Sequence, residues 1–202
     1  MKKLLIVLAV VLSIDALAQD RAIGVRLGDP TGLTIKKYTS NHALEFSIGR
    51  TLSVRRSRFY DDNFYDWYGH QNLPYSQFEY RGYRASVPIG MQLHYLFRNP
   101  ISNMFGENTS GLEWYFGFGG QARMQAYNYD YRYKVQGDPH WYYATGGRTV
   151  NFDLGLDGVI GLEYRFPEVP LDVFLDATLF MEIVDEPFYF WGQAAVGARY
   201  RF

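Results

Sequence analysis

Cysteine is absent from the 202-residue sequence, so no disulfide can contribute to the stability of the fold. Long hydrophobic runs are also absent after residue 18, which argues against a membrane-spanning helix in the mature chain. Neither sign of charge is in large excess, with 20 basic and 21 acidic residues. A nucleic-acid partner is therefore not expected, because proteins that bind nucleic acids are usually strongly basic.

The first 18 residues have the features of a cleaved secretory signal. Two lysines at positions 2 and 3 precede an apolar run from Leu4 to Leu12, and small residues at Ala16 and Ala18 resemble a cleavage site. The run is too short for a membrane anchor, which needs about 20 residues. We therefore expect that residues 1–18 are removed and that residues 19–202 form one domain.

Aromatic residues and glycine are abundant, at 18% and 20 residues respectively, and apolar and polar residues alternate over most of the chain. Between residues 171 and 183 all odd positions are apolar, whereas the even positions include Asp172, Asp176 and Glu182. A period of two predicts a β-strand with one apolar and one polar face. The pattern predicts strands at about residues 20–28, 32–39, 43–55, 80–97, 111–130, 148–166, 170–184 and 188–202.

The polar faces of these strands distinguish a soluble sandwich or lipocalin-like barrel from a barrel in lipid. A soluble protein would place these faces in water, where lysine, glutamate, serine and threonine are common. Here glycine alternates with isolated charges of both signs, which suits side chains that fill a narrow barrel. We expect a lumen charge network made of Arg26, Glu45, Arg123, Asp153, Asp157, Glu163, Asp172, Asp176, Glu182, Arg199 and Arg201, with Lys36 on the same face.

The connections and the apolar faces agree with an outer-membrane barrel. Two long connections, at about residues 56–79 and 131–147, follow the third and fifth predicted strands and so lie at one end, outside the cell if both termini are periplasmic. Aromatic residues gather at the opposite ends of the apolar faces, as in an interface girdle: Phe46, Tyr95, Phe97, Trp114, Tyr164, Phe166, Tyr200 and Phe202. The sequence predicts an all-β fold, an eight-stranded antiparallel transmembrane up-and-down β-barrel.

The signal-like start, the alternating segments and the final Tyr200-Arg201-Phe202 resemble the small eight-stranded outer-membrane proteins of Gram-negative bacteria, the family of OmpX and the barrel half of OmpA. The resemblance implies that Tyr200 and Phe202 form an insertion signal read by the barrel-assembly machinery. It also implies a location in the outer membrane, in contact with outer-membrane lipid and lipopolysaccharide. No residue follows Phe202 in this sequence, so no peptidoglycan-binding domain is expected.

The lumen and the long loops contain the candidate functional residues. We expect Arg199 and Arg201 to pair with acids of the neighbouring strand, because an eight-stranded barrel has room for its own side chains and not for a pore. Rigid tyrosine-rich loops are typical of binding surfaces, and the candidate surface comprises Tyr60, Tyr65, Trp67, Tyr68, Trp141 and Tyr142. The alternative for the second loop is that Tyr127, Tyr129, Tyr131 and Tyr133 merely prolong the fifth strand, whose period they keep.

The favoured function is a non-enzymatic outer-membrane barrel that displays aromatic loops for surface binding or envelope integrity, with no cofactor or metal. A lipid-modifying enzyme would need a histidine beside a serine or an acid, but the histidines at positions 42, 70, 94 and 140 belong to no G-x-S-x-G or H-x-x-E-H motif. The other alternative is a small barrel subunit of a larger outer-membrane transport, secretion or assembly complex. Lys37 and Arg50, which interrupt the apolar faces, fit either that role or a position at the membrane interface.

Overall fold

The structure is a computed structural model, and it describes residues 20–52, 57–70, 75–101, 111–184 and 187–202. The expected signal segment, residues 1–18, lies outside the described residues. In the described part of the chain, no helix is both long and apolar enough to cross a membrane.

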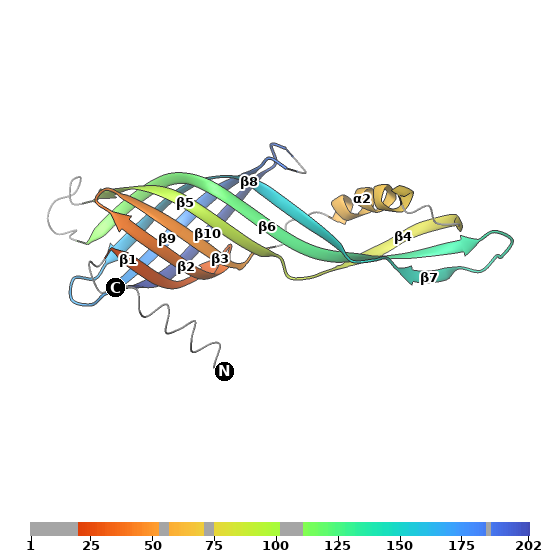
Figure 1. Ribbon diagram of the computed structural model, residues 1–202, viewed down its shortest axis with the longest axis horizontal. Coiled ribbons are helices and arrows are strands. Elements are labelled where there is room, and N and C mark those ends of the chain that lie inside the picture. The colour runs from red at the N-terminus through yellow and green to blue at the C-terminus, as the bar shows by residue number, and fades with distance from the viewer. Residues whose placement is uncertain (1–19, 53–56, 71–74, 102–110, 185–186) are drawn as a thin grey trace.

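Eight strands form a closed antiparallel barrel (Figure 1). Strand β1 pairs with β10 through Ala22 and Arg201, which closes the sheet on itself. Closure leaves no unpaired strand edge in the barrel wall, and it confirms the predicted fold class. The barrel strands in order are β1 (Arg21–Gly28), β2 (Thr31–Thr39), β3 (His42–Arg50), β5 (Ile89–Pro100), β6 (Leu112–Val135), β8 (Thr149–Arg165), β9 (Leu171–Glu182) and β10 (Phe190–Arg201).

Strand β6 is much longer than the others and carries an extension beyond the barrel. Its 24 residues span about 80 Å at roughly 3.3 Å per residue. Its first part pairs with β5 and β8, and its second part pairs with β4 (Tyr75–Ala85) and β7 (Tyr142–Thr145). Figure 1 shows this three-stranded extension projecting from the barrel end that lies away from the C-terminus, with helix α2 (Ser57–His70) beside it.

The extension corrects the prediction of two long loops. The segment 56–79 contains α2 and the beginning of β4, and the segment 131–147 contains the end of β6 and β7. The predicted strand 80–97 is divided between β4 and β5 by residues 86–88. The alternative in which four tyrosines prolong the fifth strand is confirmed, because β6 continues to Val135.

The barrel is apolar outside and polar inside. In β9, Leu171, Leu175 and Leu179 are exposed, while Asp172 and Asp176 between them are buried. Soluble monomers rarely expose continuous apolar surface of this extent. The period of two therefore sorts the side chains as predicted, with the apolar set facing outward and the charged set facing the lumen.

Aromatic side chains form a belt around the outside of the barrel at the end that holds both termini. Phe97 stacks on Phe116 with ring centroids 5.2 Å apart, and Trp114 stacks on Phe116 at 5.5 Å. Tyr164 meets Phe166 edge to face at 4.8 Å in the same zone. Such offset and edge contacts are the favoured arrangements of aromatic pairs, and they place the predicted girdle at one rim of the apolar band.

The two charges that interrupt the apolar faces lie near strand ends. Lys37 is exposed in β2 opposite Arg21, toward the end that carries the termini. Arg50 is exposed as the last residue of β3, at the end that carries the extension. Long cationic side chains at such positions can reach a polar interface while their stems cover apolar surface.

Candidate functional site

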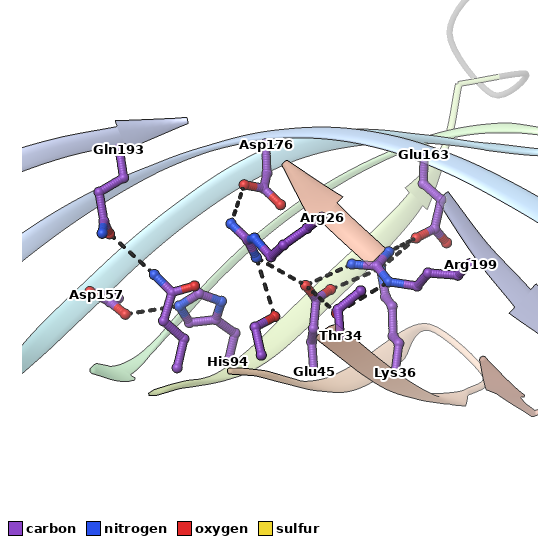
Figure 2. A network of polar contacts seen from close by, with 12 residues as sticks. Arg26, Thr34, Lys36, Glu45, His94, Asp157, Glu163, Asp176, Gln193 and Arg199 are labelled. Atoms are coloured by element: carbon purple, nitrogen blue, oxygen red, sulfur yellow. Dashed lines mark hydrogen bonds and ion pairs between the residues drawn. The ribbon is translucent and has the colours of Figure 1, made fainter. Parts of the chain in front are cut away.

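The lumen of the barrel is filled by a network of ion pairs centred on Arg199. Its guanidinium lies 2.7 Å from Glu45 Oε1 and 2.8 Å from Glu163 Oε2. Lys36 Nζ lies 2.8 Å from the same Glu163 oxygen and 3.7 Å from Glu45 Oε2. Figure 2 shows the two cations and two carboxylates converging from β10, β2, β3 and β8. All four side chains are almost completely buried, so each charge is compensated inside the protein.

Further ion pairs extend this network along the bore. Arg26 Nη2 lies 3.0 Å from Asp176 Oδ1, and Arg201 Nε lies 2.9 Å from Asp172 Oδ1. The Tyr38 hydroxyl lies between two carboxylates, 3.0 Å from Glu163 Oε1 and 3.0 Å from Asp172 Oδ2, and both oxygens are acceptors for its hydrogen. These groups lie in the lumen because of their positions along the strands, since every second side chain of a barrel strand points inward.

The predicted partner of Arg199 is wrong. The sequence predicts that Arg199 pairs with an acid of the neighbouring strand, and in the pairing of β10 with β9 it is directly opposite Asp172. The guanidinium of Arg199 instead crosses the bore to Glu45 and Glu163, and Arg201 takes Asp172. The reason is that the narrow barrel brings opposite walls within reach of a long side chain, so adjacency in the sheet does not decide the partner.

The part of the lumen nearer the extension is polar but carries fewer ion pairs. His94 Nε2 lies 2.9 Å from Asp157 Oδ2, and Gln92 donates to Gln121 at 2.9 Å and to Gln193 at 3.1 Å. The remaining predicted lumen residues lie here too: Arg123 and Glu182 are buried, and Asp153 is half-buried beside Asn151. The guanidinium of Arg123 lies 4.9 Å from the ring centroid of Phe180, and its Nη2 lies 3.9 Å from Asp29 Oδ2.

The predicted lumen charge network leaves out several side chains that line this lumen. Tyr38, Gln92, Gln121 and Gln193 are buried and hydrogen-bonded there, and Arg98 joins them close to Glu113. Strand parity would have found them, since Tyr38 follows Thr34 and Lys36 on the inward face of β2. In the described residues, no group of three or more histidine or acidic side chains is arranged to hold a metal ion.

The extension has an aromatic core of its own. Tyr60, Phe64 and Tyr68 are four residues apart on α2, so they lie on one face of the helix. They pack against Tyr127, Tyr129 and Tyr131 of β6, and all six side chains are buried in one cluster. These β6 tyrosines share the parity of the lumen residues. Helix α2 therefore covers the face that continues the lumen, and Tyr60 donates its hydroxyl hydrogen to Gln125 at 3.0 Å.

This core corrects the candidate loop surface. Tyr60 and Tyr68 are buried against the sheet and hold α2 in place, so they are not displayed. Tyr65 is 50% exposed and Tyr142 is 42% exposed, and Trp141 is half-buried. The side chain of Trp67 lies outside the described part of the structure. The prediction missed Tyr143, which is 71% exposed.

The other face of the extension carries charges held in pairs. Arg84 donates to Asp130 from Nε at 3.0 Å and from Nη2 at 2.9 Å, and Arg132 donates from Nε to Glu79 at 2.6 Å. These hydrogen bonds lower the pKa of Asp130 and the pKa of Glu79. Both carboxyl groups therefore stay ionised at neutral pH, and their partner cations stay in fixed positions.

The turn between β6 and β7 contains a carboxylate with three donors. Tyr142 donates its hydroxyl hydrogen to Asp138 at 2.7 Å, the backbone N–H of His140 donates at 2.9 Å, and the His140 ring nitrogen lies 2.8 Å away. These contacts lower the pKa of Asp138 from 3.8 to about 2. Their stabilising effect on the turn is fully present above pH 3.8 and is lost as pH falls through about 2.

We expect the Tyr142→Phe variant to raise the pKa of Asp138 toward its ordinary value, because the hydroxyl donor is the largest cause of the shift. A carboxyl-detected NMR titration of the folded protein measures the change. Tyr143→Phe is the matched control, because the groups that lower the pKa of this carboxyl belong to Tyr142 and His140, so the variant should leave the pKa near 2. An unchanged Asp138 titration in Tyr142→Phe would show that the hydroxyl does not set the pKa.

Comparisons with known proteins gave matches among solved structures. No family model and no curated protein matches the sequence. Among solved structures, Ail, the attachment invasion locus protein of Yersinia pestis, has a TM-score of 0.42 and 12% identity over 90% of this chain and 96% of that chain. Neisserial surface protein A (NspA) has a TM-score of 0.38 and 10% identity over 90% of this chain and 94% of that chain. The strand pairing of the chain itself shows that it is a small eight-stranded antiparallel β-barrel.

Proposed function

We propose that this protein is a non-enzymatic outer-membrane barrel whose closed scaffold holds an ordered extension outside the cell for binding. One observation carries the proposal: the outward face of β6 changes character along a single strand. Phe116, Phe118 and Met124 are exposed apolar residues on this face, and beyond Ala126 the same face carries Asp130 and Arg132. An apolar band that ends in charges on one strand is expected where the strand leaves lipid for water.

The filled lumen supports a scaffold and not a channel. Arg199, Lys36, Glu45 and Glu163 meet across the bore, and Tyr38 adds a hydroxyl to the same cluster. Opening a path for ions would require separating buried charges from their partners, which costs several kcal/mol per pair. The network instead joins opposite walls of the barrel and makes it a rigid support for the extension.

The extension supports a binding role because it is folded and presents aromatic groups. Its core of α2 and β6 side chains fixes the position of Tyr65 on the helix, while Tyr142 lies on β7 opposite Tyr133, on the face of the sheet that packs against α2. Tyrosine offers a large amphipathic contact area and loses little conformational freedom on binding. These two exposed tyrosines form the surface that we assign to contact with molecules outside the cell.

The non-enzymatic part of the proposal rests on where the histidine and acid pairs lie. His94 and Asp157 contact each other inside the filled lumen, where both side chains are buried. His140 contacts Asp138, but that carboxylate is occupied by Tyr142 and by a backbone N–H in a surface turn. Both pairs therefore have structural partners, and within the described contacts neither pair includes a serine or threonine hydroxyl.

Cysteine labelling on intact cells tests the proposed location and orientation. The chain has no native cysteine, so a single introduced thiol reports one position. We expect Gln77→Cys, on the exposed surface of β4, to react with a membrane-impermeant maleimide on intact Gram-negative cells. Glu168→Cys, in the exposed β8–β9 connection at the opposite end of the barrel, should react only after the outer membrane is opened. Equal labelling of the two thiols on intact cells, or the reverse order, would contradict the proposed placement.

A further inference from the structure

We propose that the charged face of the extension binds the phosphate-bearing headgroups of glycolipids in the leaflet from which it emerges. We call this surface the outward extension face, and it consists of Glu79, Arg81, Arg84, Asp130, Arg132, Lys134 and Trp141. The inference rests on the proposed location in an outer membrane. It goes beyond that proposal because it assigns a second partner, a lipid, to the face of the sheet opposite Tyr65 and Tyr142.

Strand parity determines the direction in which the outward extension face points. Along β6, Asp130, Arg132 and Lys134 follow Phe118 and Met124 at even positions, on the face that is exposed on the barrel wall. The odd positions of the same segment face α2. Because successive side chains of a strand alternate between faces, the charges point sideways over the surrounding leaflet and not over the mouth of the barrel.

The neighbouring strands complete the same face. Glu79 is opposite Arg132, and Arg84 is opposite Asn128, in the pairing of β4 with β6. Arg81 joins them through Nη1, which lies 3.3 Å from Glu79 Oε1. Figure 1 shows that β4 and the outer part of β6 continue from the barrel wall, so the face begins where the apolar band ends.

The outward extension face is basic although the whole chain is not. Four cations, Arg81, Arg84, Arg132 and Lys134, accompany two carboxylates, Glu79 and Asp130, for a formal charge of 4 − 2 = +2. The complete sequence has a formal net charge of −1. The excess of positive charge therefore lies beyond the apolar band of the barrel wall, and it complements the negative phosphates of an anionic leaflet.

Neighbouring side chains fix the positions of the cations that would bind a phosphate oxygen. Asp130 and Thr145 engage Nε and Nη2 of Arg84, at 2.8 to 3.0 Å, and its side chain is 66% exposed. This geometry fixes the guanidinium plane and directs the remaining edge outward, where an arginine can bind phosphate. Trp141 covers two further cations, with Arg132 at 4.3 Å and Lys134 at 4.7 Å from its ring centroid. These contacts limit the side-chain entropy that would be lost on binding.

Gln77→Cys carrying an environment-sensitive fluorophore provides the probe for this test, since Gln77 is exposed and lies opposite Lys134 on the same face. The labelled protein is reconstituted in phosphatidylcholine vesicles with or without lipopolysaccharide. Lipopolysaccharide is expected to shift the emission in a saturable way. Dephosphorylated lipopolysaccharide should produce a shift at least tenfold smaller, and so should free inorganic phosphate added to phosphatidylcholine vesicles.

Charge variants show whether the outward extension face is responsible. Arg81→Gln with Lys134→Gln removes two cations and is expected to weaken the lipopolysaccharide response about tenfold. Arg21→Gln with Lys37→Gln makes the same change in net charge at the opposite end of the barrel and should leave the response unchanged. Equal loss in both double variants, or an equal response to dephosphorylated lipid, would overturn the inference.

The intact-cell labelling of Gln77→Cys separates this inference from the proposed function. Labelled cells together with no lipid response would overturn headgroup binding and leave the outer-membrane placement standing. Unlabelled Gln77→Cys on intact cells would overturn the placement itself. A folded barrel in every reconstituted sample is verified by its faster gel migration before heating.

Discussion

Replacing Glu163 by leucine is expected to destabilise the folded barrel by about 3–5 kcal/mol, because the change leaves buried cations without their partner. Lys36 and Arg199 each lie 2.8 Å from Glu163 Oε2 and are almost completely buried, and Tyr38 loses the acceptor at 3.0 Å. Unfolding in urea, followed in detergent by the loss of the compact gel form, measures the difference.

Two further variants test the cause of this loss. Glu168→Gln removes a carboxylate from an exposed connection and should change stability by less than about 0.5 kcal/mol. Adding Lys36→Met to Glu163→Leu removes one of the stranded cations, so part of the lost stability should return. If Glu163→Leu alone unfolds at the same urea concentration as the unmodified protein, the ion-pair network does not contribute to stability as we infer.

Replacing Phe64 by alanine is expected to cost about 3–5 kcal/mol in the local stability of the extension, because a large buried aromatic side chain is lost. Phe64 is completely buried, and its ring lies 5.3 Å from Tyr129 and 5.4 Å from Tyr80. It joins α2 to strands β4 and β6. Limited proteolysis of the reconstituted protein should cut the extension much faster in the variant while the barrel stays intact.

Tyr65→Ala is the matched control, because the adjacent residue on the same helix is half exposed. It should leave the rate of proteolysis nearly unchanged. Loss of the compact gel form in Phe64→Ala would contradict the independence of the two parts. Equal protease resistance in the two variants would contradict the assignment of Phe64 to the core of the extension.

The inward face of β6 is polar in the barrel and aromatic in the extension. In the barrel, the inward face of β6 is polar, with Gln121, Arg123 and Gln125 buried. In the extension, the same parity carries Tyr127 and Tyr129, which α2 covers. A closed barrel encloses its inward face by itself, whereas an open three-stranded sheet needs a covering layer, and α2 supplies it.

Much of the fold was predictable because it depends on a local pattern. The alternation of apolar and polar residues assigned Leu175 and Leu179 to the outside and Asp172 and Asp176 to the inside, as the structure places them. The extension was less predictable, because the tyrosine-rich composition of residues 57–70 favours a binding loop over a helix. The spacing of four residues, at Tyr60, Phe64 and Tyr68, was a helical signal that the composition of the segment concealed.

The sequence by itself determined the strands, their two faces and the charges available to the lumen, because each follows from a period of two along the chain. Only the tertiary structure decided which charges meet. Arg199 pairs with Glu45 and Glu163 across the bore, and closure of the sheet between β1 and β10 is what brings those walls together. Likewise, only packing showed that α2 covers the inward face of the extension and leaves Arg84 and Arg132 on the outward one.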